Sequence, residues 1–351
     1  MKLAWEYFRS WASRVDANGH KLIVPVLGAG FNAQAGVAMG WAELLREVQK
    51  RHDLHTDLPD NLGIVGNSTL AWEAMVLDLA RLRGESPHKS ESTLLASAVE
   101  VLRDRYRPVG APADFARRFL EYSFTDILSF NFDELLHVDG PTFWTASPDG
   151  VQTLSQRTPL AGEFSRTRTF VEHGDGTRVW YPNGSVRSPE SLRLGMRNYG
   201  TAIRELETER EAAKAQERKI RDRLYPDGAA RALAADERET LWATQRAHAW
   251  SWVSVCLNAP LVFIGMSLGR EEWPLWWFLN QRARNFARRG IERPTFVFMR
   301  RDEADRLRVA GELNDLVLLT FDSYDRGWDR LLDALAGFGD TVAGARPALA
   351  P

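Results

Sequence analysis

The chain has 351 residues, with 45 Lys or Arg against 47 Asp or Glu, so its formal net charge is −2. This balance gives no global field toward nucleic acid or an anionic membrane, and we expect no direct nucleic-acid binding. The length is enough for one large or two smaller domains. No stretch approaches the roughly 18 apolar residues of a spanning helix, and the charged N-terminus lacks a signal-peptide core. We therefore expect a soluble, cytoplasmic protein without membrane contact.

The single cysteine, Cys256, excludes an intrachain disulfide and a zinc cluster of several cysteines from one chain. It lies in an apolar stretch, so we expect a buried and unreactive thiol. Thirteen tryptophans are unusual, and several of them cluster at 271–279. Aromatic residues at helical spacing predict either a buried core or a subunit interface. The interface gains weight because so much aromatic surface is hard to bury within one domain.

Hydrophobic periodicity predicts a first strand at 22–27. Pro25 within it lacks a backbone donor, which predicts an edge strand or a bulge. A second apolar strand, 124–130, is followed by Asn131-Phe-Asp133 and a short helical piece at 134–136. Helices are expected between these strands at 40–52, 70–83, 91–106 and 112–121.

The middle of the chain is less regular. Residues 141–170 predict long loops beside a site. Two alternating segments, 169–172 and 177–181, predict a strand pair around a turn at His173-Gly-Asp-Gly176. Charged helical patterns at 201–224 and 229–257 predict a solvated helical hairpin or a partner-docking arm.

The last third returns to buried strands, expected at 260–264, 293–299 and 314–321, with helices between them. Strands that alternate with helices indicate an α/β fold with a Rossmann-like, doubly wound parallel sheet and helices on both faces. We expect a single domain over 1–340 with a helical insertion at about 201–257. A disordered tail is expected at 341–351.

The glycine-rich turn after the first strand is the main pointer to a ligand. Gly28-Ala-Gly30 runs directly into Phe31 and a helix, and glycines let a pyrophosphate approach the backbone closely. The next glycine is Gly36, which departs from the dinucleotide fingerprint, and many such turns carry glycines for tight packing alone. Both interpretations are open at this point.

Two further strand ends carry small or polar residues, at Ser129–Asp133 and Gly265–Ser267. Ligands of open parallel sheets bind at the carboxyl ends of strands, so these segments should converge with Gly28–Gly30 on one crevice. Together with Trp41-Ala-Glu-Leu-Leu45, these motifs resemble the Sir2-like family of NAD-consuming enzymes, in particular bacterial members tied to antiphage defence. The resemblance spans about residues 20–325.

The resemblance implies a Rossmann-like fold and NAD+ as a substrate bound without metal. Asn131 would hold the nicotinamide ribose or the attacking water, and Asp133 would orient the same ribose. Cleavage develops an oxocarbenium-like ribose, so positioning and electrostatics matter more than a strong nucleophile. Without a ligand, Asn131 and Asp133 would be an Asx turn that caps the next helix. The implied binding residues are Gly28, Ala29, Gly30, Phe31, Gly36, Ser129, Asn131, Asp133, Gly265 and Ser267, the last two near the adenosine half.

The sequence departs from the family at the strand that should end in His-Gly and supply a general base. Asn183 stands at that position, and an amide accepts no proton near neutral pH. His173-Gly174, in a predicted hairpin tip, and His137 are the substitutes to weigh. Loss of a general base typically costs about 10²- to 10⁴-fold in rate, while nucleotide binding need not suffer. Asn183 therefore predicts either a natural variant with a weakened site or an alteration that traps substrate.

Four functions remain in view. The leading one is an NAD+ glycohydrolase that acts as the effector of an antiphage, abortive-infection system. Its control would require a homo-oligomer, a partner protein such as an ATPase, or a phage-derived activator. A lysine deacylase is disfavoured because one cysteine cannot build the usual zinc ribbon. The others are a sensor that binds NAD or ADP-ribose without turnover, favoured by Asn183, and an oligomeric scaffold for a defence partner.

Overall fold

The structure is a computed structural model that describes residues 2–37, 40–54, 68–105, 110–137, 142–147, 150–153, 163–226, 233–269, 272–289 and 292–337. Its strands are β1 (Val24–Leu27), β2 (Asp126–Ser129), β3 (Thr142–Ser147), β4 (Gly150–Thr153), β5 (Thr169–Glu172), β6 (Arg178–Trp180), β7 (Leu261–Ile264), β8 (Thr295–Arg300) and β9 (Leu316–Phe321). Its helices are α1 (Lys2–Ala12), α2 (Ala29–Gln34), α3 (Trp41–Arg51), α4 (Ser68–Arg83), α5 (Pro87–Arg105), α6 (Ala111–Leu120), the 3₁₀ turn η1 (Pro189–Ser191), α7 (Met196–Leu224), α8 (Ala235–Ala247), α9 (Trp252–Cys256), α10 (Trp273–Arg289), α11 (Arg301–Leu313) and α12 (Tyr324–Ala336).

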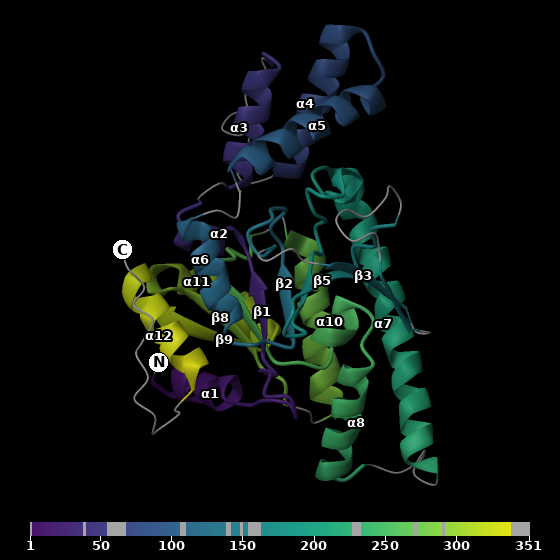
Figure 1. Cartoon of the computed structure of the whole chain (residues 1–351), viewed down its shortest axis with the longest axis vertical. Helices are drawn as coiled ribbons and strands as arrows, with labels where there is room; N and C mark the ends of the chain where they lie inside the picture. The colour runs from purple at the N-terminus through teal and green to yellow at the C-terminus, as the bar shows by residue number, and fades with distance from the viewer. Residues whose placement is uncertain are drawn as a thin grey trace.

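The described strands form one nine-stranded sheet in the order β4-β3-β5-β6-β2-β1-β7-β8-β9. The six from β6 to β9 run parallel, and β5, β3 and β4 extend the sheet antiparallel. Numbered along the chain, the parallel strands stand in the order 3-2-1-4-5-6, which is the Rossmann order. The predicted α/β, Rossmann-like fold is confirmed (Figure 1).

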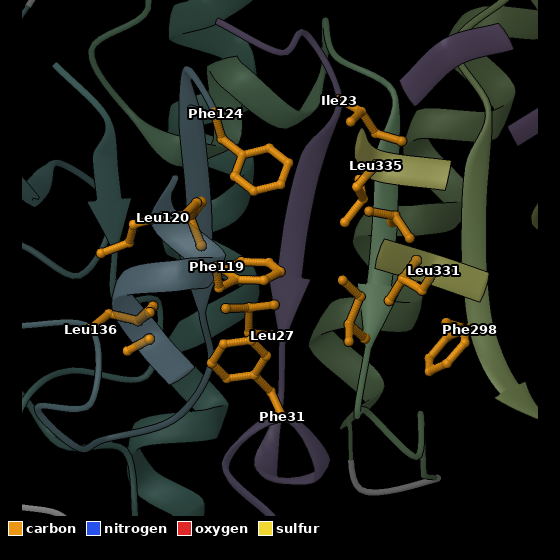
Figure 2. Close-up of a cluster of buried hydrophobic side chains, with 14 of the residues drawn as sticks. Ile23, Leu27, Phe31, Phe119, Leu120, Phe124, Leu136, Phe298, Leu331 and Leu335 are labelled. Atoms are coloured by element: carbon orange, nitrogen blue, oxygen red, sulfur yellow. The ribbon is translucent and has the colours of Figure 1, made fainter. Parts of the chain in front are cut away.

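Helices cover both faces of the sheet, and the side chains of β1 alternate between the two faces. Ile23 and Leu27 pack on one face with residues of α1, α6 and α12 (Figure 2). Val24 and Val26 pack on the other face with residues of α9, α10 and α11. The tryptophan-rich segment contributes to this second core, since Trp276 and Trp277 are packed against it.

A bundle of α3, α4 and α5 forms a separate layer beyond the sheet, at the top of Figure 1. Its apolar core includes Trp72, Leu94 and Leu102, and residues Phe132 and Val186 belong to the same cluster. These two follow β2 and β6, so the bundle is anchored at the carboxyl ends of these strands. Helices α7 and α8 form a hairpin at the side of the sheet, with a small apolar cluster of their own.

Pro25 was expected at an edge or a bulge, and this prediction is wrong because β1 lies in the middle of the sheet. The N–H groups of Val24 and Gly28 donate to carbonyls on the β7 side, at 2.9 and 3.0 Å. Alternation then turns the Pro25 nitrogen toward β2, and the β1–β2 register starts only at Val26, opposite Leu128. No ladder hydrogen bond is lost by the missing donor.

Other differences lie outside the buried strands. The segment 141–170, expected as loops, contains β3 and β4, and β3 pairs with β5. Residues 134–136 form a turn instead of a short helix, and the helix expected over 229–257 is divided into α8 and α9. The tail at 341–351 lies outside the described residues.

Candidate functional site

The carboxyl ends of β6, β2, β1 and β7 surround a cavity of about 390 Å³. The strand order reverses between β1 and β7, and such a switch point is where open α/β sheets bind ligands. Loops after the four strands supply part of the lining, and residues at the beginning of α3, α4, α7 and α10 supply the rest. The described lining residues are Gly28, Ala29, Gly30, Gly40, Trp41, Ser68, Thr69, Phe130, Asn131, Asn183, Tyr199, Gly265, Met266, Ser267, Leu268 and Glu272.

The glycines at this edge let two loops approach each other. A Cβ on Gly28 would lie 2.7 Å from the Gly265 carbonyl oxygen, and a Cβ on Gly30 would lie 2.7 Å from Gly265 Cα. Gly265 itself has φ +67, and its Cβ would lie 2.6 Å from the Gly30 carbonyl carbon. Packing of the β1 loop on the β7 loop therefore explains all three glycines.

The backbone amides of the same turn are also engaged within the protein. The Gly30 N–H donates to the Gly265 carbonyl, and the Phe31 N–H donates to the Gly28 carbonyl, both at 2.9 Å. A phosphate could use these two amides only after the loops rearranged. Of the two interpretations of Gly28-Ala-Gly30, tight packing thus has direct geometric support, although the turn does line the cavity.

Asn131 lines the cavity, and its side chain is held by two acceptors. Its Nδ2 donates to the Gly28 carbonyl at 3.0 Å and to Asn32 Oδ1 at 3.1 Å. With both amide hydrogens donated, Oδ1 is the atom that can accept a hydrogen bond from a ligand. Asn32, the residue after Phe31, thereby orients a candidate site residue, and no motif in the sequence marks Asn32 for this role.

Asp133 lies one step further from the cavity. Its carboxylate accepts a hydrogen bond from Asn32 Nδ2 at 2.5 Å and another from the Leu135 N–H at 2.8 Å. Burial raises the pKa of Asp133, and these two hydrogen bonds oppose that rise. The chain Asp133–Asn32–Asn131 makes Asp133 a group that orients Asn131, and the Leu135 contact is the Asx turn considered from the sequence.

Asn183 follows β6 and lines the cavity with only 5% of its surface exposed. Its side-chain Nδ2 donates to the Phe130 carbonyl at 3.2 Å, and its backbone carbonyl accepts from the backbone N–H of Arg193 at 2.9 Å. Asn183 is thus fixed at the cavity wall, where its side chain offers an amide and no base.

Some predicted binding residues do not line this cavity. Phe31 is buried in the core, with its ring 4.8 Å from that of Phe119, and Figure 2 shows it beside Leu27. Gly36 ends the turn after α2 with φ +81, and an added Cβ would have no neighbouring atom within 4 Å. Ser129 is buried in β2, opposite Leu27.

Neither candidate histidine is among the described lining residues. His173 lies in the turn between β5 and β6, where its N–H donates to the Thr177 carbonyl. His137 is buried between Phe143 and Tyr181, with ring centroids 5.5 and 5.1 Å away, and burial holds its pKa well below 6.5. A direct general base must reach the proton it abstracts, so the geometry supports neither residue in that role.

Several lining residues were not expected as binding groups. Trp41, Tyr199 and Glu272 line the cavity, and the ring centroids of Trp41 and Tyr199 lie 6.4 Å apart. Trp41 had been considered only within the motif Trp41–Leu45. Glu272 had been noted only within the tryptophan-rich stretch, and no local signal marks it as a site residue.

Comparison with models of known protein families gives no match, and comparison with curated proteins gives none either. Within the described ranges, no helix is long and apolar enough to cross a membrane. The same part of the chain contains no group of three or more His, Cys, Asp or Glu side chains that could hold a metal ion.

Proposed function

We propose that this chain is an NAD+ glycohydrolase, which cleaves NAD+ to nicotinamide and ADP-ribose. One observation carries the proposal: the cavity at the reversal of strand order gathers Ala29, Asn131, Asn183 and Ser267 from the ends of four neighbouring strands. These residues were selected from the sequence because of their resemblance to a Sir2-like NAD site.

The chemistry of the lining suits this reaction. Asn131 Oδ1 is oriented by the two hydrogen bonds that its Nδ2 donates, so it can accept from a ribose hydroxyl or from the attacking water. Trp41 and Tyr199 offer ring faces and edges to the planar groups of a dinucleotide. The beginnings of α3, α4 and α7 at the cavity add partial positive charge, which favours a pyrophosphate.

A second function is favoured by one residue. Asn183 provides no proton acceptor where the family pattern has a histidine, which fits a protein that binds NAD or ADP-ribose without turnover. Such a protein would act as a sensor or as an oligomeric scaffold for a partner. The two functions differ in product formation and share the same cavity.

The test measures NAD+ binding by calorimetry and nicotinamide release by chromatography on the same preparation. We expect Asn131→Ala to weaken both, because it removes the oriented acceptor. Asn183→His is expected to raise the rate by up to about 10²-fold, the lower end of what a general base contributes. Asn285→Ala, on α10 and not among the described lining residues, is the matched control and should change neither quantity.

Each outcome assigns a function. Release of nicotinamide supports the glycohydrolase, whereas binding of NAD+ or ADP-ribose with no product over hours supports the sensor. Absence of both binding and turnover in the wild type and in Asn183→His would remove both functions.

The cellular part of the proposal follows from the resemblance alone. As an antiphage effector in the cytoplasm, the chain would deplete NAD+ only when a homo-oligomer forms or when an ATPase partner or phage-derived activator binds. Cellular NAD+ should then fall during infection in cells that carry the wild type and stay constant with Asn131→Ala. Light scattering that gives a monomer under all activating conditions would count against the oligomer.

A further inference from the structure

A line of hydrogen bonds runs from the buried carboxylate of Asp133 to Asn131 at the cavity. Asp133 accepts from the Leu135 N–H through Oδ1 and from Asn32 Nδ2 through Oδ2, at 2.8 and 2.5 Å. Asn32 Oδ1 accepts from Asn131 Nδ2 at 3.1 Å, and the same Nδ2 donates to the Gly28 carbonyl at 3.0 Å. Asn32 and Asp133 are 2% and 4% exposed, so bulk water does not compete for these bonds.

The groups at the two ends of this line fix the direction of its hydrogen bonds. The Leu135 N–H can only donate, and the Gly28 carbonyl can only accept. A carboxylate accepts on both oxygens, whereas a side-chain amide donates on one side and accepts on the other. With a carboxylate at Asp133, the Asn32 amide must turn its nitrogen toward Asp133 and its oxygen toward Asn131. Asn131 then donates from Nδ2 within the protein and keeps Oδ1 for the cavity.

Asn131 is the member of this line that a ligand in the cavity can reach. It lines the cavity and also a smaller adjoining pocket, to which Asn32 and Asp133 contribute. If the Asn32 amide turned over, its nitrogen would face Asn131 Nδ2 and two donors would oppose each other. Asn131 would relieve this contact by turning over as well, which would place Oδ1 against the Gly28 carbonyl and Nδ2 toward the ligand. The direction of the line therefore decides which atom Asn131 offers.

We propose that Asn32 is a positioning residue, which transmits the direction of hydrogen bonding from the Asp133 carboxylate to Asn131. Asn131 thereby offers an acceptor oxygen to a ligand group that donates. Asp133 acts on the ligand without touching it, in contrast to the direct role at the ribose that the family resemblance implies. The inference rests on the proposed glycohydrolase function for its ligand group, which is a ribose hydroxyl or the attacking water.

An exchange of the two residue types tests this direction. In Asp133→Asn the new amide oxygen is needed by the Leu135 N–H, so its nitrogen must face Asn32 and the reversed direction reaches Asn131. In Asn32→Asp two buried carboxylates meet, which disfavours both charges. In the double variant Asn32→Asp/Asp133→Asn, the new amide accepts from Leu135 and donates to the new carboxylate, which accepts from Asn131 as Asn32 does now. The double variant thus restores what either single change removes.

Calorimetry with NAD+ and chromatography of released nicotinamide measure the effect. We expect Asp133→Asn to raise the Kd for NAD+ by about 2- to 10-fold, which corresponds to one hydrogen bond. Its kcat/KM should fall by about 10²-fold, as for a misplaced group at a reacting centre. The double variant should return to within about threefold of the wild type in Kd and within about tenfold in kcat/KM. Asp114→Asn, the same chemical change at an exposed side chain on α6, is the control and should change neither quantity.

Repeating the change without the Asn131 side chain separates positioning from direct contact. If Asp133 acts through Asn131, adding Asp133→Asn to Asn131→Ala should lower kcat/KM by less than about twofold further, because the group that it orients is gone. Urea unfolding of every variant measures the structural cost separately. A purely structural role would lower stability and would reduce turnover by the same factor with and without the Asn131 side chain.

Two results would overturn the inference and leave the glycohydrolase function in place. One is a double variant that does not fold or that turns over NAD+ no faster than Asp133→Asn. The other is an equal loss of turnover from Asp133→Asn in the presence and absence of the Asn131 side chain, which would make Asp133 a residue that contacts the ligand.

If the wild type neither binds nor cleaves NAD+, the proposed function falls, and hydrogen exchange at Asn131 Nδ2, measured by NMR, decides the inference. Protection that is lost in Asp133→Asn and regained in the double variant supports the positioning role of Asn32. Protection that is unchanged in Asp133→Asn overturns it.

Discussion

Replacing Gly265 by Ala should separate the two loops that form the edge of the cavity. Gly265 has φ +67, and an added Cβ would lie 2.6 Å from the Gly30 carbonyl carbon and 2.8 Å from Gly30 Cα. Both are backbone atoms of the β1–α2 turn, so no flexible side chain can move aside. Gly36 supplies the matched control, because it has φ +81 with no atom within 4 Å of its added Cβ.

Both variants place an L-residue in a left-handed backbone conformation, but only Gly265→Ala also introduces a steric overlap. A left-handed backbone costs an L-residue about 1–2 kcal/mol, and the loss of unfolded-state freedom in Gly→Ala returns about 0.4–1 kcal/mol. Gly36→Ala should therefore lose about 1 kcal/mol. Gly265→Ala adds overpacking of about 1–3 kcal/mol, which gives a total of about 2–4 kcal/mol.

Urea unfolding of both variants and the wild type measures this difference. The midpoints should shift with little change in the slope m, because the surface exposed on unfolding is unchanged. Calorimetry with NAD+ should show weaker binding for Gly265→Ala than for Gly36→Ala. Equal losses of stability in the two variants would refute the argument that loop contact requires Gly265.

Two further predictions concern buried polar groups. Asp126 is fully buried, accepts from Trp180 Nε1 at 2.9 Å and lies 2.8 Å from Arg178, so Asp126→Asn should destabilise the fold by about 3–5 kcal/mol in urea unfolding. Asp114→Asn, which affects an exposed ion pair, should change the free energy of unfolding by less than about 1 kcal/mol. Similar losses in the two variants would contradict the expectation that the buried pair matters more. His137 has a folded pKa well below 6.5, so the unfolded chain takes up a proton first as the pH falls below that value. Below that pH the free energy of unfolding should therefore fall by about 1.4 kcal/mol per pH unit because of His137. Between pH 7.5 and 5.5, His137→Phe should lose less stability than the wild type. An equal loss in both proteins would exclude His137 as the cause.

The parallel part of the fold could be predicted because buried parallel strands are short apolar runs and the helices between them are amphipathic. β3 and β4 were missed because they are rich in polar residues. β3 is half-buried and adds to the sheet beyond β5, where Thr145 and Thr169 place their hydroxyls 2.9 Å apart. Their pairing depends on a partner strand that local periodicity does not reveal.

The position of the site was predictable from topology, whereas its side chains were only partly so. Asn131, Asn183 and Ser267 meet at the cavity because carboxyl ends of parallel strands share one edge. Phe31 does not line it because core packing buries its ring, whereas Asp133 is bound to Asn32 and lines a smaller neighbouring pocket that shares Asn131 with the cavity. The contributions of α4 and α10 depend on how whole layers of the fold pack together, which no motif in the sequence predicts.

The pairing of β1 with β7 also has a consequence for biosynthesis. Val24–Leu27 is synthesised well before its partner Leu261–Ile264, because more than 230 residues separate the two strands in the sequence. At 5–20 residues per second, the central strand waits on the order of ten seconds or more with one edge unpaired. Such an apolar edge favours association with other nascent chains, so we expect the yield of folded protein to depend on chaperones that shield this strand until β7 has been synthesised.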